Sequence, residues 1–141
     1  MDADEVIARY RLEPHPEGGH YRETFRASAA NGGRGSVSAI YYLLKAGETS
    51  AWHRIDAVEI WHHYAGAPLR LSLCSDGTTV SERLLGSSDG AAPQAVVPVG
   101  CWQSAVSLGE WTLVGCTVAP AFEFSGFELA SPEWRPGMPS A

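Results

Sequence analysis

From residue 20 onward, the chain is a succession of short runs rich in β-branched and aromatic residues, separated by turn-forming residues. Such runs are typical of β-strands, and we expect strands at 21–26, 37–44, 51–55, 59–64, 69–74, 78–85, 95–97, 102–108, 111–119 and 122–130. Turns such as Asn31-Gly32-Gly33 and Asp76-Gly77 recur at intervals of about 8–12 residues, as in sandwiches and barrels. Parallel crossovers need about a dozen residues each, so the pattern favours an all-β fold, a closed antiparallel barrel or jelly roll.

The two ends of the chain differ from this pattern. One short helix is predicted over residues 2–10, where apolar residues lie one turn apart and Asp2 can cap the first turn. Prolines and glycines at 14–19 then interrupt regular structure. Residues 131–141 hold three prolines and a glycine, so we expect an irregular tail there. We predict a single domain over residues 1–141, with the barrel at about 20–130.

Charge and cysteine content exclude several classes of protein. Ten Lys and Arg against sixteen Asp and Glu give a net charge of -6, so the basic surface of a nucleic-acid-binding protein is missing. No apolar run approaches the roughly 18–20 residues of a membrane span, and the acidic start is unlike a signal peptide. We expect a soluble, cytoplasmic protein that binds neither nucleic acid nor membranes. Cys74, Cys101 and Cys116 form no Cys-x-x-Cys pair and are expected to be buried free thiols.

The histidines mark the first candidate site. His53, His62 and His63 fall within eleven residues of each other, with Glu59 between them. Alternate residues of a strand share a face, so Glu59 and His63 should point one way and His62 the other. A turn at 56–58 would close a hairpin that places His53 across from Glu59 or from the next residue on the same face.

The same stretch matches a known motif. It is Gly47-x5-His53-x-Ile55-x3-Glu59-x6-Gly66, which has every spacing of the first motif of the cupin superfamily. The one departure is Ile55, which stands where that motif has its second histidine.

A second cupin motif is partly present as Pro98-x-Gly100-x2-Gln103, with Gln103 in place of its histidine. Further segments, among them 14–19 and 114–120, are similar to the short cupin-5 subfamily, which is catalogued as a domain of unknown function. The chain therefore resembles a cupin over roughly residues 5–130. The resemblance implies a double-stranded β-helix with a pocket at its mouth, usually assembled as a homodimer.

The resemblance also locates the positions that hold a metal in other cupins. His53 and Glu59 are kept, but Ile55 cannot bind a metal and the neutral amide of Gln103 is a poor ligand. We therefore expect no metal cofactor. The alternative is a divalent metal held by His53 and Glu59, with His63 as a substitute ligand, and oxygenase chemistry.

Metal-free chemistry would use the same residues differently. A histidine beside a carboxylate can act as a general base, so the candidate catalytic residues are His53, Glu59 and His63. Tyr41, Tyr42 or Tyr64 could supply an acid on the opposite face of a substrate. This arrangement resembles the cupin epimerases that act on keto-deoxysugar nucleotides.

The candidate ligand-binding residues combine amide, aromatic and cationic groups; they are Gln103, Trp61, Tyr41, Arg22 and Arg54. His15 and Glu17, with Arg22 and Arg26 after them, could close over the pocket as a lid or cap one end of the barrel. We predict that the pocket binds a small polar metabolite, with a sugar or sugar nucleotide favoured and epimerase or isomerase chemistry as the leading reaction. Binding without catalysis and a metal-dependent oxygenase are the alternatives.

Overall fold

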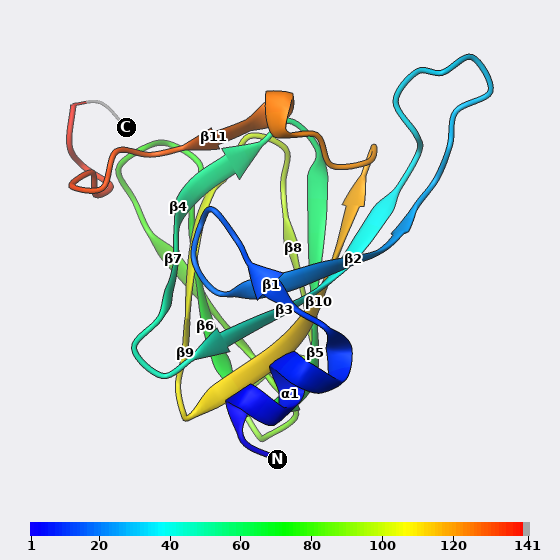
Figure 1. The fold of residues 1–141 in the computed structure, drawn as a ribbon. Helices are drawn as coiled ribbons and strands as arrows, with labels where there is room; N and C mark the ends of the chain where they lie inside the picture. Colours follow the sequence, from blue (N-terminus) through cyan, green and yellow to red (C-terminus); the bar gives the residue numbers. More distant parts are fainter. Residues whose placement is uncertain (140–141) are drawn as a thin grey trace.

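Two antiparallel sheets face each other in the computed structural model, which describes residues 1–139 (Figure 1). In chain order the elements are α1 (Ala3–Tyr10), β1 (Glu13–Pro14), β2 (His20–Arg26), β3 (Ser38–Lys45), β4 (Thr49–Ile55), β5 (Val58–Gly66), β6 (Leu69–Cys74), β7 (Ser81–Leu85), β8 (Gln94–Val97), β9 (Trp102–Ser107), β10 (Trp111–Ala119), the 3-10 turn η1 (Phe124–Gly126) and β11 (Phe127–Leu129). One sheet has the order β1-β2-β3-β10-β5-β8 and the other β11-β4-β9-β6-β7. The predicted all-β jelly roll with a short N-terminal helix is confirmed.

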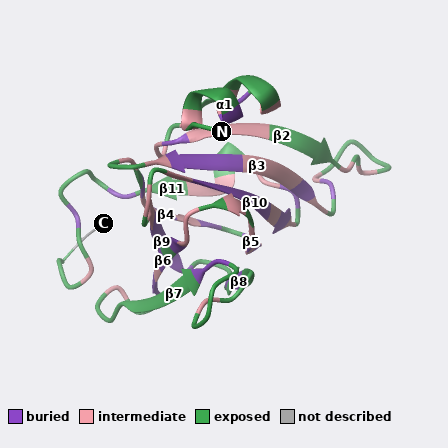
Figure 2. Ribbon diagram, turned by 90° about the horizontal axis from the view of Figure 1, so that it is seen from below, coloured by how far each residue is buried: buried purple, intermediate pink, exposed green. Residues whose placement is uncertain are grey.

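Helix α1 begins at a capping box. The Asp2 side chain accepts a hydrogen bond from the backbone N–H of Glu5, and the Glu5 side chain accepts one from the N–H of Asp2. The helix lies on the outside of the six-stranded sheet, where Val6 packs with Leu43 and Leu113 while the opposite helix face is exposed (Figure 2). No helix within residues 1–139 has the length and apolar character needed to cross a membrane.

The main core lies between the two sheets. On β6 the alternate residues Leu69, Leu71 and Leu73 point inward, as the two-residue period of a strand requires. They meet Tyr42, Trp61 and Val114 from the facing sheet, together with other residues of the same cluster. This layer fills the barrel below the end where η1 and β11 lie (Figure 1).

The predicted hairpin at residues 56–58 is wrong. Strand β4 pairs with β9 and β11, whereas β5 pairs with β10 and β8, so these two consecutive strands belong to opposite sheets. The chain crosses at Asp56, whose carboxylate accepts two hydrogen bonds from the Arg34 guanidinium. His53 is therefore paired in its own sheet with Gln103, and Glu59 contacts the side chain of Gln103 from the other sheet.

Two strands differ in their bounds from the sequence prediction, one because a side chain binds the backbone and one because aromatic rings pack within a loop. The strand predicted from 78 begins at Ser81, because the Asp76 carboxylate accepts hydrogen bonds from the N–H groups of Thr78 and Thr79 and holds a turn. The strand predicted at 122–130 is a loop, η1 and the short β11. The strand was predicted because aromatic residues have a high β-propensity. In the structure their rings pack on one another, and the ring centroids of Phe122 and Phe124 are 4.9 Å apart.

The tail contains turns and bends but no helix or strand over residues 131–139. The last two residues of the predicted irregular tail, Ser140 and Ala141, lie outside the described residues. The proline-rich segment near the other end does include a short strand that the sequence did not predict, since Glu13 and Pro14 pair with Tyr21 and His20 at the sheet edge.

Gly18 allows the proline-rich segment to lie against β4. Its φ is +109°, and a Cβ at this position would overlap the backbone carbonyl of Thr49. We expect Gly18→Ala to lower the free energy of unfolding by about 3 kcal/mol, through both the clash and the positive φ. Gly47→Ala is the matched control, because Gly47 has a φ of +82° but open space around it, and it should cost about 1 kcal/mol. Urea unfolding of both variants checks this; equal losses would contradict it.

Candidate functional site

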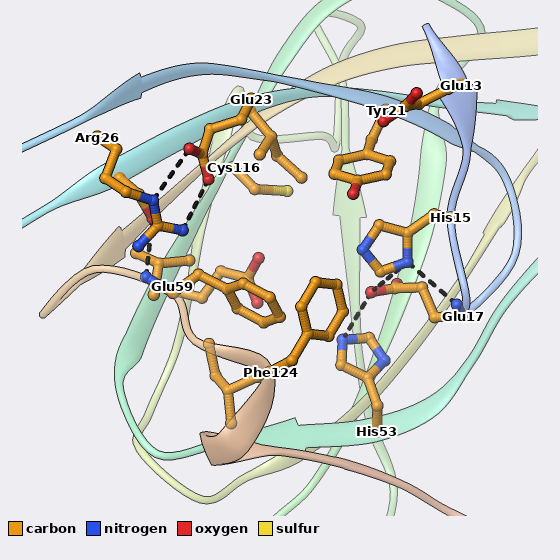
Figure 3. Close-up of a pocket in the computed structure, with 15 residues that line it drawn as sticks. Glu13, His15, Glu17, Tyr21, Glu23, Arg26, His53, Glu59, Cys116 and Phe124 are labelled. Atoms are coloured by element: carbon orange, nitrogen blue, oxygen red, sulfur yellow. Dashed lines mark hydrogen bonds and ion pairs between the residues drawn. The ribbon is translucent and has the colours of Figure 1, made fainter.

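A cavity of about 230 Å³ opens between the sheets beside η1. Its polar wall carries Glu17, His53 and Glu59, and its apolar wall includes Ile55 and Phe124 (Figure 3). A concave site that combines apolar lining with convergent polar groups is typical of small-molecule binding, and this wall is rich in polar groups.

Glu59 on β5 is buried and held by a fixed chain of hydrogen bonds. Its Oε1 accepts from the amide nitrogen of Gln103 at 2.8 Å, and the Gln103 amide oxygen accepts from the indole N–H of Trp61 at 2.9 Å. Because an indole nitrogen can only donate, the Gln103 amide can adopt only this orientation. Gln103 therefore acts as a hydrogen-bond donor to Glu59.

The environment of Glu59 places its titration near neutral pH. Burial is the main cause that raises its pKa to about 7, and the negative charge of Glu17 acts in the same direction. His53, Gln103 and Cys116 act in the opposite direction. Burial, together with the charge of Glu59, also holds the pKa of the Cys116 thiol well above its usual range.

The two ring nitrogens of His53 on β4 have different neighbours. Its Nδ1 lies 2.7 Å from the carbonyl oxygen of Ala51, which can only accept, so Nδ1 carries a proton. Its Nε2 lies 3.5 Å from Glu17 Oε1. Because Nδ1 carries a proton, Nε2 is the nitrogen that gains or loses one beside the carboxylate of Glu17.

The proline-rich segment forms part of the cavity wall. The side chains of His15 and Glu17 are only 5% and 10% exposed and lie next to His53 (Figure 3). The Glu17 backbone N–H donates to His15 Nδ1 at 3.0 Å, so this nitrogen is unprotonated and its 3.5 Å approach to the Glu17 carboxylate is not an ion pair. Burial lowers the pKa of His15, in agreement with a neutral ring. Ser50 donates a hydrogen bond to the other oxygen of Glu17.

Several sequence candidates lie away from this cavity. Trp61 is buried in the core and reaches Glu59 only through Gln103. Arg22 donates to the carbonyl of Tyr10 and lies 5.5 Å from the Tyr41 ring centroid, on the outer face near α1. Arg54 pairs with Glu128 on the surface and covers the ring of Trp102.

The histidines of β5 are also outside the cavity. Strand alternation predicts that Glu59 and Trp61 share a face, and both side chains are buried. His63 lies four residues further along, roughly 13 Å at the usual rise of a strand, and its Nε2 contacts the carbonyl of Ala67 at 3.1 Å. His62 contacts the hydroxyl of Thr117 at 3.1 Å.

The cavity wall includes residues that the sequence analysis did not select. Among them are Tyr21 and Glu23 of β2, Cys116 of β10 and the aromatic residues before β11. Arg26 of β2, expected near the pocket together with His15 and Glu17, also lines the cavity. Alternation along β2 could have indicated Tyr21 and Glu23 together, but a register shift follows Glu23 and changes the pattern before Arg26.

The four positions that hold a metal in cupins do not form a metal site here. Ile55 has no donor atom, and both ends of the Gln103 amide are engaged by Trp61 and Glu59. Within residues 1–139, no group of three or more His, Cys, Asp or Glu side chains is arranged to hold a metal ion. The donor set therefore does not fit a cupin metal centre.

The raised pKa of Glu59 predicts a pH-dependent cost to stability. Between about pH 4.5 and 7 the carboxyl group is protonated in the folded protein and ionised in the unfolded chain, so stability falls as pH rises through this interval. Glu59→Gln should remove this fall, and at pH 8 its free energy of unfolding should exceed that of the parent by up to about 3 kcal/mol. Urea unfolding from pH 5 to 8 measures the difference. The exposed Glu128→Gln should follow the parent at every pH; a parallel profile for Glu59→Gln would contradict the assignment.

Comparisons with known proteins agree with this fold. Residues 4–130 match the family model described as Cupin superfamily (DUF985). A crystal structure of a protein from Shewanella oneidensis superposes with a TM-score of 0.88 at 38% identity, covering 93% of this chain and 85% of that one. A hypothetical protein from Leishmania major gives a TM-score of 0.82 at 29% identity, covering 91% and 86%.

Oxalate decarboxylase from Bacillus subtilis is a more distant structural neighbour. It matches at a TM-score of 0.65 and 14% identity over 87% of this chain and 30% of that chain, which is a likeness of fold alone. No curated protein matches the sequence significantly. The matched family model covers most of the chain, from α1 to the end of the barrel, and the chain belongs to the DUF985 family of the cupin superfamily.

Proposed function

We propose that the cavity binds a small polar metabolite and transfers a proton on it by general acid–base catalysis that needs no metal. The observation that carries the proposal is the placement of His53 and Glu59 on facing sheets, both lining one cavity. Each can gain or lose a proton.

The reaction we propose is isomerisation or epimerisation next to a carbonyl group. One of the two residues removes the proton from carbon, and the electron pair moves onto the carbonyl oxygen. The other residue returns a proton to carbon from the opposite sheet, and exchange with water restores both. A group with a pKa near 7, as for Glu59, suits either direction of transfer at neutral pH.

The surroundings favour such chemistry. Ile40, Ile55 and Val118 line the cavity with apolar surface, so charges inside interact more strongly than they would in water. At about 230 Å³ the cavity lies below the range of roughly 300–1,000 Å³ that is common for drug-sized ligands. One sugar ring is a suitable size, whereas the nucleotide of a sugar nucleotide would project from the mouth. The homodimer and the cytoplasmic location expected from the sequence stay predictions.

Proton exchange in heavy water tests the reaction. A panel of small carbonyl compounds, including single-ring sugars and keto acids, is incubated with the protein in D2O and followed by ¹H NMR. We expect loss of one C–H signal next to the carbonyl group in at least one compound. His53→Ala and Glu59→Gln should each slow exchange at least 100-fold, since general acid–base catalysis contributes about 10²–10⁴.

The matched controls are His62→Ala and Glu128→Gln, which change the same residue types outside the cavity and should exchange at the parent rate. An absence of exchange across the panel would argue against catalysis. Equal exchange rates in His53→Ala and His62→Ala would show that His53 takes no part in the proton transfer.

Metal content is checked separately on protein purified without an affinity tag. We expect well under one metal ion per chain after growth in metal-supplemented medium, because Ile55 and Gln103 supply no ligand. Elemental analysis before and after dialysis against a chelator measures this. One tightly held ion per chain would overturn the metal-free mechanism.

A further inference from the structure

The charged groups of the cavity wall are predominantly acidic. Four carboxyl groups, those of Glu13, Glu17, Glu23 and Glu59, lie around a space whose wall contains one permanent cation, Arg26. A wall with an excess of one charge attracts ligands of the opposite charge and repels ligands of the same charge.

Arg26 is already neutralised by its neighbour. Its Nε and Nη2 donate to the two carboxylate oxygens of Glu23 at 3.0 and 2.8 Å, a bidentate pair at one side of the cavity (Figure 3). A phosphate or carboxylate ligand would have to displace Glu23 to bind this guanidinium. The wall therefore offers an anion little attraction.

On the other side of the cavity, no donor lies between His53 and Glu17 when the His53 ring is neutral. His53 Nε2 and Glu17 Oε1 face each other at 3.5 Å, and both are acceptors when the ring is neutral (Figure 3). His15 is neutral beside them. Even when His53 carries a proton, carboxylates outnumber cations in the wall. A bound group with several N–H donors and a positive charge would satisfy both acceptors.

Aromatic rings complete the surroundings of such a group. Tyr21, Phe122 and Phe124 line the same cavity. Their rings present electron-rich faces, which attract ammonium groups by about 0.5–2 kcal/mol.

We propose that the ligand of this cavity is a small amine, whose ammonium group lies among Glu17, His53, Glu59 and the aromatic wall. The inference rests on the proposed function, since it names the substrate class of that site. For the proposed reaction it selects amino-bearing carbonyl compounds over phosphorylated sugars and sugar nucleotides. A bound ammonium favours the ionised form of Glu59, which gives Glu59 the role of base and His53, once protonated, that of acid.

Ligands matched in size and different in charge test the inference without any reaction. Propylamine, 1-propanol and propionate are titrated at pH 7 into ¹⁵N-labelled protein, and saturable shifts of the backbone amide signals of His15, Glu17 and residues 53–59 report binding. We expect propylamine to bind at least tenfold more tightly than propanol, and propionate to be the weakest. Glucosamine against glucose repeats the comparison with a ligand that fills more of the cavity.

Single-site variants then locate the charge. Glu17→Gln keeps an acceptor for Ser50 but removes one negative charge, so it should weaken propylamine binding several-fold and leave propanol unchanged. Glu128→Gln removes an exposed carboxylate away from the cavity and should have no effect.

The pH dependence supplies a second readout. Glu59 is faced by Gln103 from β9, by Cys116 from β10, by His53 from β4 and by Glu17 from the proline-rich segment. Propylamine stays charged from pH 6 to 8, while Glu59 ionises over this interval. The affinity of the protein for propylamine should therefore rise up to about tenfold between pH 6 and 8, and Glu59→Gln should abolish this rise.

The outcomes separate this inference from the proposed function. Equal binding of amine and alcohol, tighter binding of propionate, or no saturable shift with either amine would overturn the amine assignment, even if proton exchange occurs. Amine-selective binding without proton exchange on any amino-bearing carbonyl compound would support the assignment and remove the catalytic proposal.

Discussion

The hydrogen bond from Gln103 to Glu59 joins the two sheets at the base of the cavity. Gln103 belongs to β9 and Glu59 to β5, and Trp61 from the core fixes the direction of the amide between them. Without this donor, a buried carboxyl group would be left with unsatisfied acceptors, which is a costly arrangement. The same bond holds the carboxyl group where it can face a ligand and is one of the contacts that keep its pKa from rising further.

At two of the four positions that hold a metal in other cupins, this barrel carries residues with other roles. Where the second motif of other cupins places a histidine ligand, Gln103 turns a donor toward the retained glutamate. Ile55 adds apolar wall at the other altered position. The two retained residues then differ in environment, because Glu59 is buried against the core while His53 has one ring nitrogen satisfied by the backbone and one facing the cavity. Pairs of titratable groups in unlike environments are typical of acid–base sites.

Much of the fold follows from local pattern, whereas the composition of the cavity does not. Ten strand-like runs and the motif around His53 predicted the jelly roll and placed both His53 and Glu59 at a site. Alternation on β5 put Glu59 and Trp61 on one face, which the structure buries. It could not show that His63 lies too far along the strand, nor that Arg22 turns to α1. Residues from β2 and from the loop before β11 enter the wall through long-range pairing, which a single sequence does not report.

The crossing at Asp56 places residues only six positions apart on opposite walls. Facing sheets in such folds stand about 10 Å apart, and the side chains of His53 and Glu59 occupy much of that distance. The gap left between them is set by the separation of the sheets, which the packed core beneath holds constant. A ligand bound there would be selected by its thickness: a flat molecule would contact both walls at once, whereas a branched one would have to force the sheets apart.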